Sequence, residues 1–409
     1  MRVLASTTAG AGHLGPMVPV LQACGQAGHD VLVACPESFT SQVARLGFSW
    51  TAFDDSPREE WAAVVSRLPG LSHDEANRIV VGEIFARINT TAALPRLTET
   101  VDEWRPDLII RDPSEYASWI LAERFGVPSV RVSITLLAAD LIWSRIAAQA
   151  LSDIATADGF TPDPAGTRLS AGPILAAAPA SFDPPGELDA AAVHRYGEVV
   201  AREHVLPPQV PEGDEPLVYV TFGTVAASLG LWPSLYRPIV DALADLPVRV
   251  LVTSGEGVEV SQLGPLPPQT AVATFVPQDH VLAHAAVMVA HGGFGTVLGG
   301  LRAGVPMVLA PLFADQPYNA ARVEELGAGI TVGTSHPATV VRPGLVAEVP
   351  ASEVRAAVLR LLEDTAPRLA VRRLAQEMAS HPSISSLVPL LKRIASRVEL
   401  WGGVRRGRR

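Results

Sequence analysis

Short apolar runs alternate with helical segments along most of this sequence, and this alternation limits the possible folds more than any other feature. Residues 2–7, 31–35 and 48–53 are β-forming runs, and segments with helical spacing of apolar residues separate them. Parallel strands must be joined by crossover connections, most often helices. The pattern therefore predicts an α/β domain with an open parallel sheet.

The same alternation begins again in the second half of the chain, after a stretch rich in proline and acidic residues. Further strands are expected at 217–222, 248–253, 271–275, 287–290, 305–310 and 330–332, and helices at 351–363, 367–379 and 384–398. We predict a domain over residues 1–204, a linker at 205–216, a second domain over 217–380, and a final helix with a basic tail over 381–409.

Composition argues against several classes of protein. With 409 residues, 48% hydrophobic and 18% charged, the chain can form more than one globular domain. A net charge of −10 argues against nucleic acid as the main partner. No apolar run approaches the roughly 18 residues that span a membrane. We recognise no signal peptide, and Cys24 and Cys35 lie in apolar surroundings, so we expect reduced thiols in a cytoplasmic protein. Both a monomer and a homodimer remain open.

Polar residues follow the expected strands in both domains. In open parallel sheets, ligands bind beside the carboxyl ends of the strands, so these loops are where chemistry is expected. The residues in question are His13, Asp112, Thr224, Gln278, His291, Asp315 and Gln316. Their presence in both halves predicts a ligand-binding cleft between two facing domains.

One of these loops has the layout of a diphosphate site. An apolar run ends at Ala290, residues 291–296 read His-Gly-Gly-Phe-Gly-Thr, and an apolar helical stretch follows. Glycines let the backbone approach a ligand closely, and a helix start offers unpaired N–H groups and a positive dipole end. We expect His291 to add a hydrogen-bond donor there.

A second glycine-rich turn, at residues 10–15, satisfies the G-x-G-x-x-G pattern of dinucleotide sites, with Glu37 as a candidate for the acid expected further on. However, His13 occupies the tightest part of this turn, where it would push a pyrophosphate away. Residues 291–296 are also the better phosphate turn. A nicotinamide or flavin enzyme is therefore the weaker alternative.

His13 is instead a candidate base. At the start of a helix the dipole disfavours imidazolium, so we expect a lowered pKa and a neutral ring that accepts a proton. Asp112, which ends a neighbouring strand, is a candidate to fix the tautomer of the ring and stabilise its charge. A structural alternative stays open, in which His13 caps a turn and Asp112 is the N-cap of a helix beginning at Pro113.

Two further loops suit a sugar and a flat ring. Asp315 and Gln316 place a carboxylate beside an amide, which fits two neighbouring hydroxyl groups, although a plain N-cap aspartate is the alternative. Residues 275–278, Phe-Val-Pro-Gln, put an aromatic ring and free backbone groups at a strand end, where a base can stack. The alternative there is an ordinary proline turn.

Together these motifs resemble those of the family-one glycosyltransferases with the GT-B fold, in particular the bacterial antibiotic and natural-product branch of macrolide, enediyne and polyketide enzymes. They occur in the order and spacing of that family over nearly the whole chain. The matching stretches are residues 12–16, 221–224, 275–278, 291–296 and Asp315-Gln316 with Asn319-Ala320. The resemblance implies two facing Rossmann-like domains, with the last helix crossing back to the first.

The resemblance also implies an activity, the inverting, metal-independent transfer of a sugar from a nucleoside-diphosphate donor to a hydroxyl of a hydrophobic aglycone such as a polyketide. In this branch the donor is typically a TDP-deoxysugar, and no cofactor or stable membrane insertion is implied. His13 would be the general base, oriented by Asp112. The nucleotide and diphosphate would be bound by Gly12, Thr224, Phe275, Val276, Gln278, His291, Gly293, Gly295 and Thr296, and the donor sugar by Asp315 and Gln316.

The acceptor pocket is expected in the N-terminal domain, outside the motifs. Candidates are Trp61, Phe85, Ile88, Leu136, Leu137 and Trp143, with a core position as the alternative for each. Three positions depart from the family pattern, because Ala290 replaces a histidine, Phe275 stands where tryptophan is common, and Phe294 replaces a small residue. We expect Phe294 to narrow or reshape the donor pocket.

Two other functions fit the same architecture. A sugar-nucleotide epimerase would need a second acid beside the donor sugar, and the sequence offers Asp315 without a paired acid. A non-catalytic nucleotide-sugar-binding protein would not need both His13 and Asp112. Transfer, epimerisation and binding without turnover are separate outcomes of one assay with a panel of nucleotide sugars.

Overall fold

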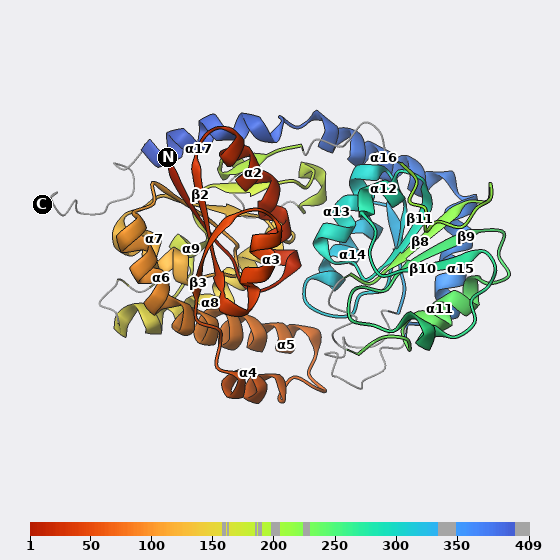
Figure 1. The fold of residues 1–409 in the computed structure, drawn as a ribbon, viewed down its shortest axis with the longest axis horizontal. Coiled ribbons are helices and arrows are strands. Elements are labelled where there is room, and N and C mark those ends of the chain that lie inside the picture. The colour runs from red at the N-terminus through yellow and green to blue at the C-terminus, as the bar shows by residue number, and fades with distance from the viewer. Residues whose placement is uncertain are drawn as a thin grey trace, which may run out of the picture.

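The protein contains two parallel sheets with helices on both faces, one in each half of the chain (Figure 1). This computed structural model describes residues 1–157, 161, 163–184, 186, 190–197, 205–223, 230–333 and 349–396. The strand order is β3-β2-β1-β4-β5-β6-β7 in the first sheet and β10-β9-β8-β11-β12-β13 in the second. Both sheets therefore have the Rossmann order, in which the first three strands are added towards one edge and the next strands are added on the other side of the first strand. The predicted α/β class with two Rossmann-like domains is confirmed.

The strands are short and mostly buried. In the first sheet they are β1 (Arg2–Ser6), β2 (Asp30–Pro36), β3 (Ser49–Phe53), β4 (Leu108–Arg111), β5 (Ser129–Val132), β6 (Ile174–Ala176) and β7 (Val193–Arg195). In the second they are β8 (Leu217–Thr221), β9 (Arg249–Thr253), β10 (Thr270–Ala273), β11 (Ala285–Ala290), β12 (Met307–Leu309) and β13 (Gly329–Thr331). The central strands β4 and β8 are buried along their whole length, as expected when helices cover both faces.

Helices connect these strands. Those of the first half are α1 (Ala11–Leu14), α2 (Val18–Gln26), α3 (Thr40–Arg45), α4 (Arg58–Val65), α5 (His73–Ile79), the π-helix η3 (Val80–Asn89), α6 (Thr90–Trp104), α7 (Ala117–Phe125), α8 (Leu137–Ala157) and α9 (Thr167–Ser170). Those of the second are α11 (Tyr236–Leu243), α12 (Gln278–Leu282), α13 (Phe294–Ala303), α14 (Gln316–Glu325), α15 (Ala351–Glu363), α16 (Thr365–Ser380) and α17 (Leu387–Ser396).

Local sequence explains where several helices begin and end. α5 starts with a capping box, because Ser72 accepts from the amide of Glu75 while the Glu75 carboxylate accepts from the amide of Ser72. α7 begins at Ala117 because the Glu115 carboxylate accepts a hydrogen bond of 2.9 Å from the Ala117 amide. It ends at Phe125 and is followed by Gly126, whose φ of 66° suits glycine at a helix C-terminus.

The largest cluster of buried apolar side chains runs through both halves of the molecule. Val3 and Ala5 of β1 face this cluster, while Leu4 between them faces a second cluster on the other side of the sheet. Phe182, in the short helix η4 (Ala180–Phe182), is fully buried, and its ring centre lies 6.4 Å from that of Phe294 at the start of α13. The two halves therefore share one continuous apolar core.

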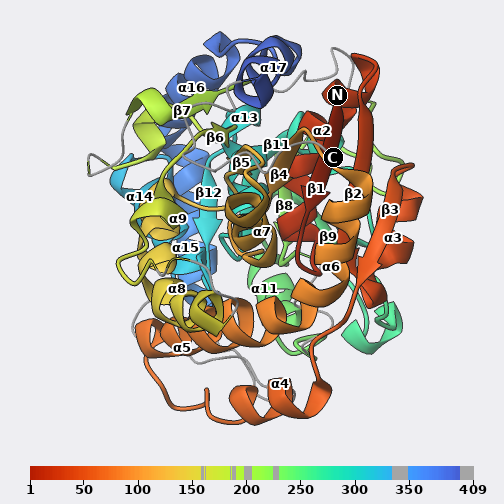
Figure 2. The ribbon, with the colours of Figure 1, turned by 90° about the vertical axis from the view of Figure 1, so that its left-hand side faces the viewer.

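The last helix, α17, lies over the first half of the chain (Figures 1 and 2). It contacts β4, and Leu387 and Leu391 are buried in the shared core. Cys24 and Cys35 are buried free thiols, and burial raises the pKa of each to about 11. Among the described residues, no helix is long and apolar enough to cross a membrane. The basic tail lies outside the described part of the chain.

Candidate functional site

The predicted site residues lie where the strand order of each sheet reverses. In the first sheet β1 and β4 are neighbours, and His13 follows β1 while Asp112 follows β4. In the second sheet β8 and β11 are neighbours, and Gly223 follows β8 while His291 follows β11. Loops that leave such a pair of strands diverge, which opens the crevice where open α/β sheets bind ligands.

His13 and Asp112 are joined by a short hydrogen bond, with 2.7 Å between Nδ1 and Oδ2. Asp112 is fully buried and His13 is 22% exposed. The second carboxylate oxygen of Asp112 accepts from the amide of Ser114 at 2.8 Å, and the Thr8 hydroxyl donates to Oδ2 at 3.0 Å. Asp112 thus both caps its turn and binds His13. Because an ionised carboxylate only accepts, Nδ1 carries the hydrogen and Nε2 of the neutral ring has a free lone pair.

The pKa of His13 is raised, contrary to the expectation from the helix dipole. Burial, the largest effect, lowers this pKa, but the charge of Asp112, its hydrogen bond and the charge of Asp315 together raise it. The helix dipole does not lower this pKa, because α1 has only four residues and His13 lies in its last turn. Burial alone would raise the pKa of Asp112, but His13 and the amides of Ser114 and Thr8 lower it.

The ring of His291 is packed between two glycines. A methyl group at Gly293 would lie 2.5 Å from Nε2 of His291, and one at Gly223 would lie 2.9 Å from the same atom. Both glycines are therefore needed to make room for this ring, a role that differs from the ligand contact expected of Gly293 from the sequence. Burial lowers the pKa of His291 to about 4, against the effect of a hydrogen bond with the Thr221 backbone, so the ring is neutral at ordinary pH.

The start of α13 presents unpaired N–H groups. Gly293 is its N-cap and provides no side-chain capping bond. In the part of the chain that the structure describes, the amides of Phe294, Gly295 and Thr296 make no hydrogen bond. Nδ1 of His291 is also buried without a partner there. Free amides at the positive end of a helix dipole suit a phosphate group.

Residues 275–278 combine an exposed ring with free backbone groups. Phe275 is 67% exposed and lies beyond β10, which ends two residues earlier than expected. Val276 has a buried side chain, but within the described residues neither its N–H nor its C=O makes a hydrogen bond. The side chain of Gln278 does not lie with Phe275 and Val276. It lies over Gly299 of α13, and its Nε2 donates to the Thr296 carbonyl at 3.4 Å.

Gln316 shapes the loop of residues 311–315, which joins β12 to α14. Its Oε1 accepts from the amides of Leu312, at 2.8 Å, and Phe313, at 3.1 Å. Only its NH₂ group therefore remains for a ligand, so Gln316 can act as a donor but not as the expected donor–acceptor pair.

Asp315 is tied to the glycine turn by Asn319, whose Nδ2 donates to Asp315 Oδ2 at 2.8 Å and to the carbonyl of Gly292 at 2.9 Å. Asp315 is the N-cap residue of α14, as the alternative expected, but its side chain makes no capping bond to the helix. Burial raises the pKa of Asp315, with Asn319, Thr135 and His13 opposing this effect. The 311–315 loop contacts the first half of the chain through the carbonyl of Ala314, next to Asp315.

The acceptor candidates separate into two groups, Phe85 and Trp61, which are accessible to solvent, and the others, which are buried. The ring of Phe85, on the π-helix η3, lies with its centre 5.7 Å from that of His13. Trp61, on α4, is 47% exposed. The remaining candidates are buried core residues, namely Ile88, Leu136, Leu137 and Trp143. Thr224 lies outside the described residues, and Gly12 lies in α1 beside His13.

Phe294 does not have the role expected from the sequence. Its side chain is only 4% exposed and packs against Phe182 in the core that joins the two halves. The backbone of Phe294 begins α13 directly after the glycine turn, whereas its ring lies in the core against Phe182. Phe294 therefore contributes little surface to any donor pocket.

Phe294→Leu is expected to lower the free energy of unfolding by about 1–2 kcal/mol, because a smaller side chain packs less well against Phe182. The choice between two competing donor substrates should not change. Denaturant unfolding and a two-donor competition assay measure these effects. A changed donor preference at unchanged stability would restore the original expectation.

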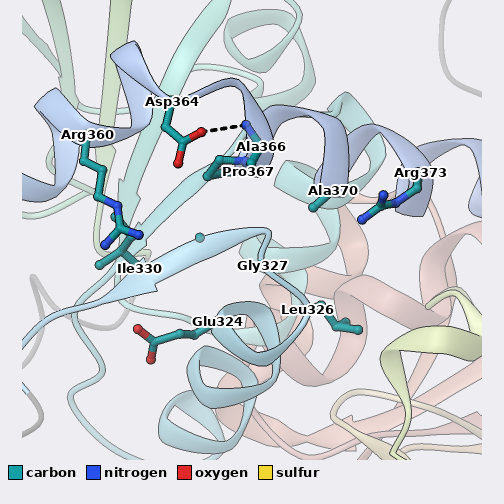
Figure 3. A pocket seen from close by; sticks show the side chains of 11 residues that line it. Glu324, Leu326, Gly327, Ile330, Arg360, Asp364, Ala366, Pro367, Ala370 and Arg373 are labelled. Atoms are coloured by element: carbon teal, nitrogen blue, oxygen red, sulfur yellow. Dashed lines mark hydrogen bonds between the residues drawn. The ribbon is translucent and has the colours of Figure 1, made fainter.

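A cavity of about 360 Å³ lies elsewhere, between the end of α14 with β13 and the junction of α15 with α16 (Figure 3). Charged residues of both signs line it, namely Glu324, Asp364, Arg360 and Arg373. Asp364 is already engaged, because its carboxylate accepts from the Ala366 amide at 2.8 Å and caps α16. None of the predicted site residues lines this cavity.

Comparison with known proteins shows similarity across both halves. The N-terminal domain model of "Erythromycin biosynthesis protein CIII-like" matches residues 22–184, and the C-terminal domain model matches residues 237–394. The L-demethylnoviosyl transferase of Streptomyces niveus is 32% identical over 346 residues, covering 81% of this chain and 85% of that protein. The demethyllactenocin mycarosyltransferase of Streptomyces fradiae is 30% identical over 342 residues, covering 78% and 73%.

A solved structure, the glycosyltransferase VinC in complex with dTDP, is 26% identical to this chain. It superimposes with a TM-score of 0.74 over 97% of this chain and 100% of that one. The similarity therefore includes both sheets and the loops that meet between them.

Proposed function

The chain belongs to the erythromycin biosynthesis protein CIII-like family of glycosyltransferases and has the GT-B fold, and from this premise we propose that it transfers a deoxysugar from a TDP-sugar to a hydroxyl group of a hydrophobic natural product, with inversion and without a metal. The observation that carries this proposal is the His13–Asp112 hydrogen bond of 2.7 Å, formed beyond the ends of the neighbouring strands β1 and β4, where the order of the strands reverses.

The proposed reaction is a single displacement. Nε2 of His13 takes the proton of the acceptor hydroxyl while its oxygen forms a bond to the anomeric carbon of the donor sugar. The bond from that carbon to the diphosphate breaks, and the diphosphate leaves with both bonding electrons. Asp112 stabilises the imidazolium that forms, and the free amides at the start of α13 stabilise the charge on the leaving group.

The donor would lie along the second half. Phe275 offers an exposed ring for stacking, with the free backbone groups of Val276 beside it to read the edge of a base. The Asp315 carboxylate would accept from a sugar hydroxyl while the NH₂ of Gln316 donates to a neighbouring one. The choice of TDP is supported by the similarity to VinC, which was solved with dTDP.

An assay of the purified protein with a panel of TDP- and UDP-sugars and several polyketide and aromatic aglycones tests this proposal. Mass spectrometry should detect a glycoside and an equal amount of nucleoside diphosphate. Conversion of the donor to its epimer would favour the epimerase alternative, and binding without turnover would favour a non-catalytic protein. NMR of the glycoside should show the anomeric configuration opposite to that of the donor.

The pH dependence of transfer follows from the raised pKa of His13. A base must be neutral to accept a proton, so kcat/KM should fall as the pH drops through a pKa above the ordinary histidine value of about 6.5. Asp112→Asn removes the main charge that raises this pKa, so the acid limb should move to lower pH. A pH–rate profile of both enzymes measures this shift. An acid limb that stays in place would show that His13 is not the titrating base.

A further inference from the structure

Ala314, the residue before Asp315, has a left-handed backbone conformation with φ of 55°. Only one other non-glycine residue in the described part of the chain, Arg105, has a positive φ. Residues with side chains avoid this region, and they persist in it only where surrounding contacts hold them. The contacts around Ala314 therefore indicate what fixes the 311–315 loop.

Those contacts come from α5, in the other half of the molecule (Figure 1). Nε2 of His73 lies 2.5 Å from the carbonyl oxygen of Ala314, and Nδ2 of Asn77 lies 3.2 Å from the same oxygen. A carbonyl can only accept, so Nε2 of His73 carries the hydrogen. His73 and Asn77 are one helical turn apart, which places both side chains on the same face of α5.

A second set of contacts supports the same pairing of elements. The hydroxyl of Tyr318, on α14, donates to Asp74 Oδ1 at 2.7 Å, and the ring of Tyr318 meets that of His73 edge-on at 5.2 Å. His73 is 15% exposed at its side chain and Asn77 is buried. The contact of α5 with the 311–315 loop and α14 is therefore a partly buried, hydrogen-bonded interface.

We propose that His73 and Asn77 are positioning residues, which hold the Ala314 carbonyl so that Asp315 is presented to the donor sugar beside His13. This inference rests on the proposed role of Asp315 in binding the donor sugar. The α5 helix runs directly into η3, which carries Phe85 next to His13. The continuous segment of α5 and η3, in the first half of the chain, thus contacts both the 311–315 loop and His13.

The double variant His73→Ala/Asn77→Ala tests this role. Misplacement of Asp315 should lower kcat/KM for the nucleotide sugar by about 10- to 100-fold. The Kd of the free nucleoside diphosphate, which has no sugar for Asp315 to bind, should stay within about twofold, because these side chains do not contact residues 291–296. Steady-state kinetics and calorimetry give the two values.

Two controls separate positioning from general stabilisation. Arg322→Met removes two other hydrogen bonds between the halves, to the carbonyls of Phe182 at 2.9 Å and Ser181 at 2.7 Å, without contacting Ala314. Its kcat/KM should stay close to that of the wild type. His73→Gln in the otherwise unchanged protein keeps an N–H donor and should retain most activity.

If the double variant does not fold, Asn77→Asp carries the test, because it keeps the shape and replaces the NH₂ donor with a carboxylate that repels the Ala314 carbonyl. The inference would be overturned if Arg322→Met lowered kcat/KM as much as the double variant does. It would also be overturned if the His73 and Asn77 variants lost affinity for the nucleoside diphosphate by the same factor as they lost kcat/KM. Failure of the proposed function itself would appear in the wild-type protein, as absence of glycoside.

Discussion

His13→Ala is expected to lower kcat for an alcohol acceptor by about 10²–10⁴-fold, the usual contribution of a general base. The variant loses the atom that takes the proton, whereas the glycine turn at 291–296 keeps all of its groups. The Kd of the nucleoside diphosphate should therefore change by less than about twofold. Kinetics at saturating donor and calorimetry with the nucleoside diphosphate measure these values.

Two variants accompany this one. Asp112→Asn keeps the shape of the side chain but loses the charge that stabilises imidazolium, so its kcat should also fall while folding is retained. His29→Ala removes a histidine that contacts the N-terminal amino group, 3.4 Å away, and takes no part in the site. It should transfer sugar at the wild-type rate. Near-wild-type turnover in His13→Ala would remove its assignment as the base.

Gly293→Ala is expected to weaken nucleoside diphosphate binding by about 10- to 100-fold, the equivalent of losing one or two hydrogen bonds to a charged group. The backbone at Gly293, with φ of −60° and ψ of 141°, is accessible to alanine, so strain is not the cause. The added methyl group would lie 2.5 Å from Nε2 of His291. Either the ring or the start of α13 must move, and both are proposed to contact the diphosphate. Calorimetry gives the change in Kd.

A double-mutant cycle tests the cause of this loss. His291→Ala should itself weaken binding, because it removes a ring that is proposed to contact the diphosphate. Once the ring is gone, however, the methyl group at Gly293 has nothing to displace, so the double variant should bind no worse than His291→Ala alone. Gly25→Ala, in α2, adds a methyl group in open space and serves as the control. Full affinity in Gly293→Ala would show that the diphosphate does not bind at this turn.

The fold and the His13–Asp112 pair could be predicted because both follow from one-dimensional patterns. Apolar runs separated by helical spacing specify parallel strands, and the order of those strands places the loops after β1 and β4 next to each other. Polar residues in these two loops, such as His13 and Asp112, are therefore brought together by the strand order itself. The position of His291 between β11 and the start of α13 could be predicted in the same way, from an apolar run followed by glycines and a helical stretch.

Features that depend on side-chain direction could not be predicted. The sequence does not reveal that the ring of Phe294 points into the core beside Phe182, or that Gly293 makes room for His291. The raised pKa of His13 was missed for a similar reason, since burial lowers this pKa while Asp112 and, less strongly, Asp315 raise it. These properties arise only when segments that are distant in the sequence, or side chains of one turn, pack in three dimensions.

The contact of His73 and Asn77 with Ala314 had no sequence signal at all. A left-handed alanine looks like any other alanine, and a histidine at the start of a helix is common. Only the backbone angle of Ala314 and the short distance to Nε2 of His73 identify the contact. The burial of Leu136 and Trp143 could not be predicted for a related reason, because they are as apolar as pocket residues but lie in the core.

The role of His13 as the base is tested most directly by comparing two acceptors of similar shape, an aliphatic alcohol and a phenol that is already ionised at the assay pH. If His13 takes the proton, the ratio of wild-type to His13→Ala kcat should be about 10²–10⁴ for the alcohol and should fall to within about tenfold for the phenolate, which needs no base. An equal ratio for both acceptors would contradict that role.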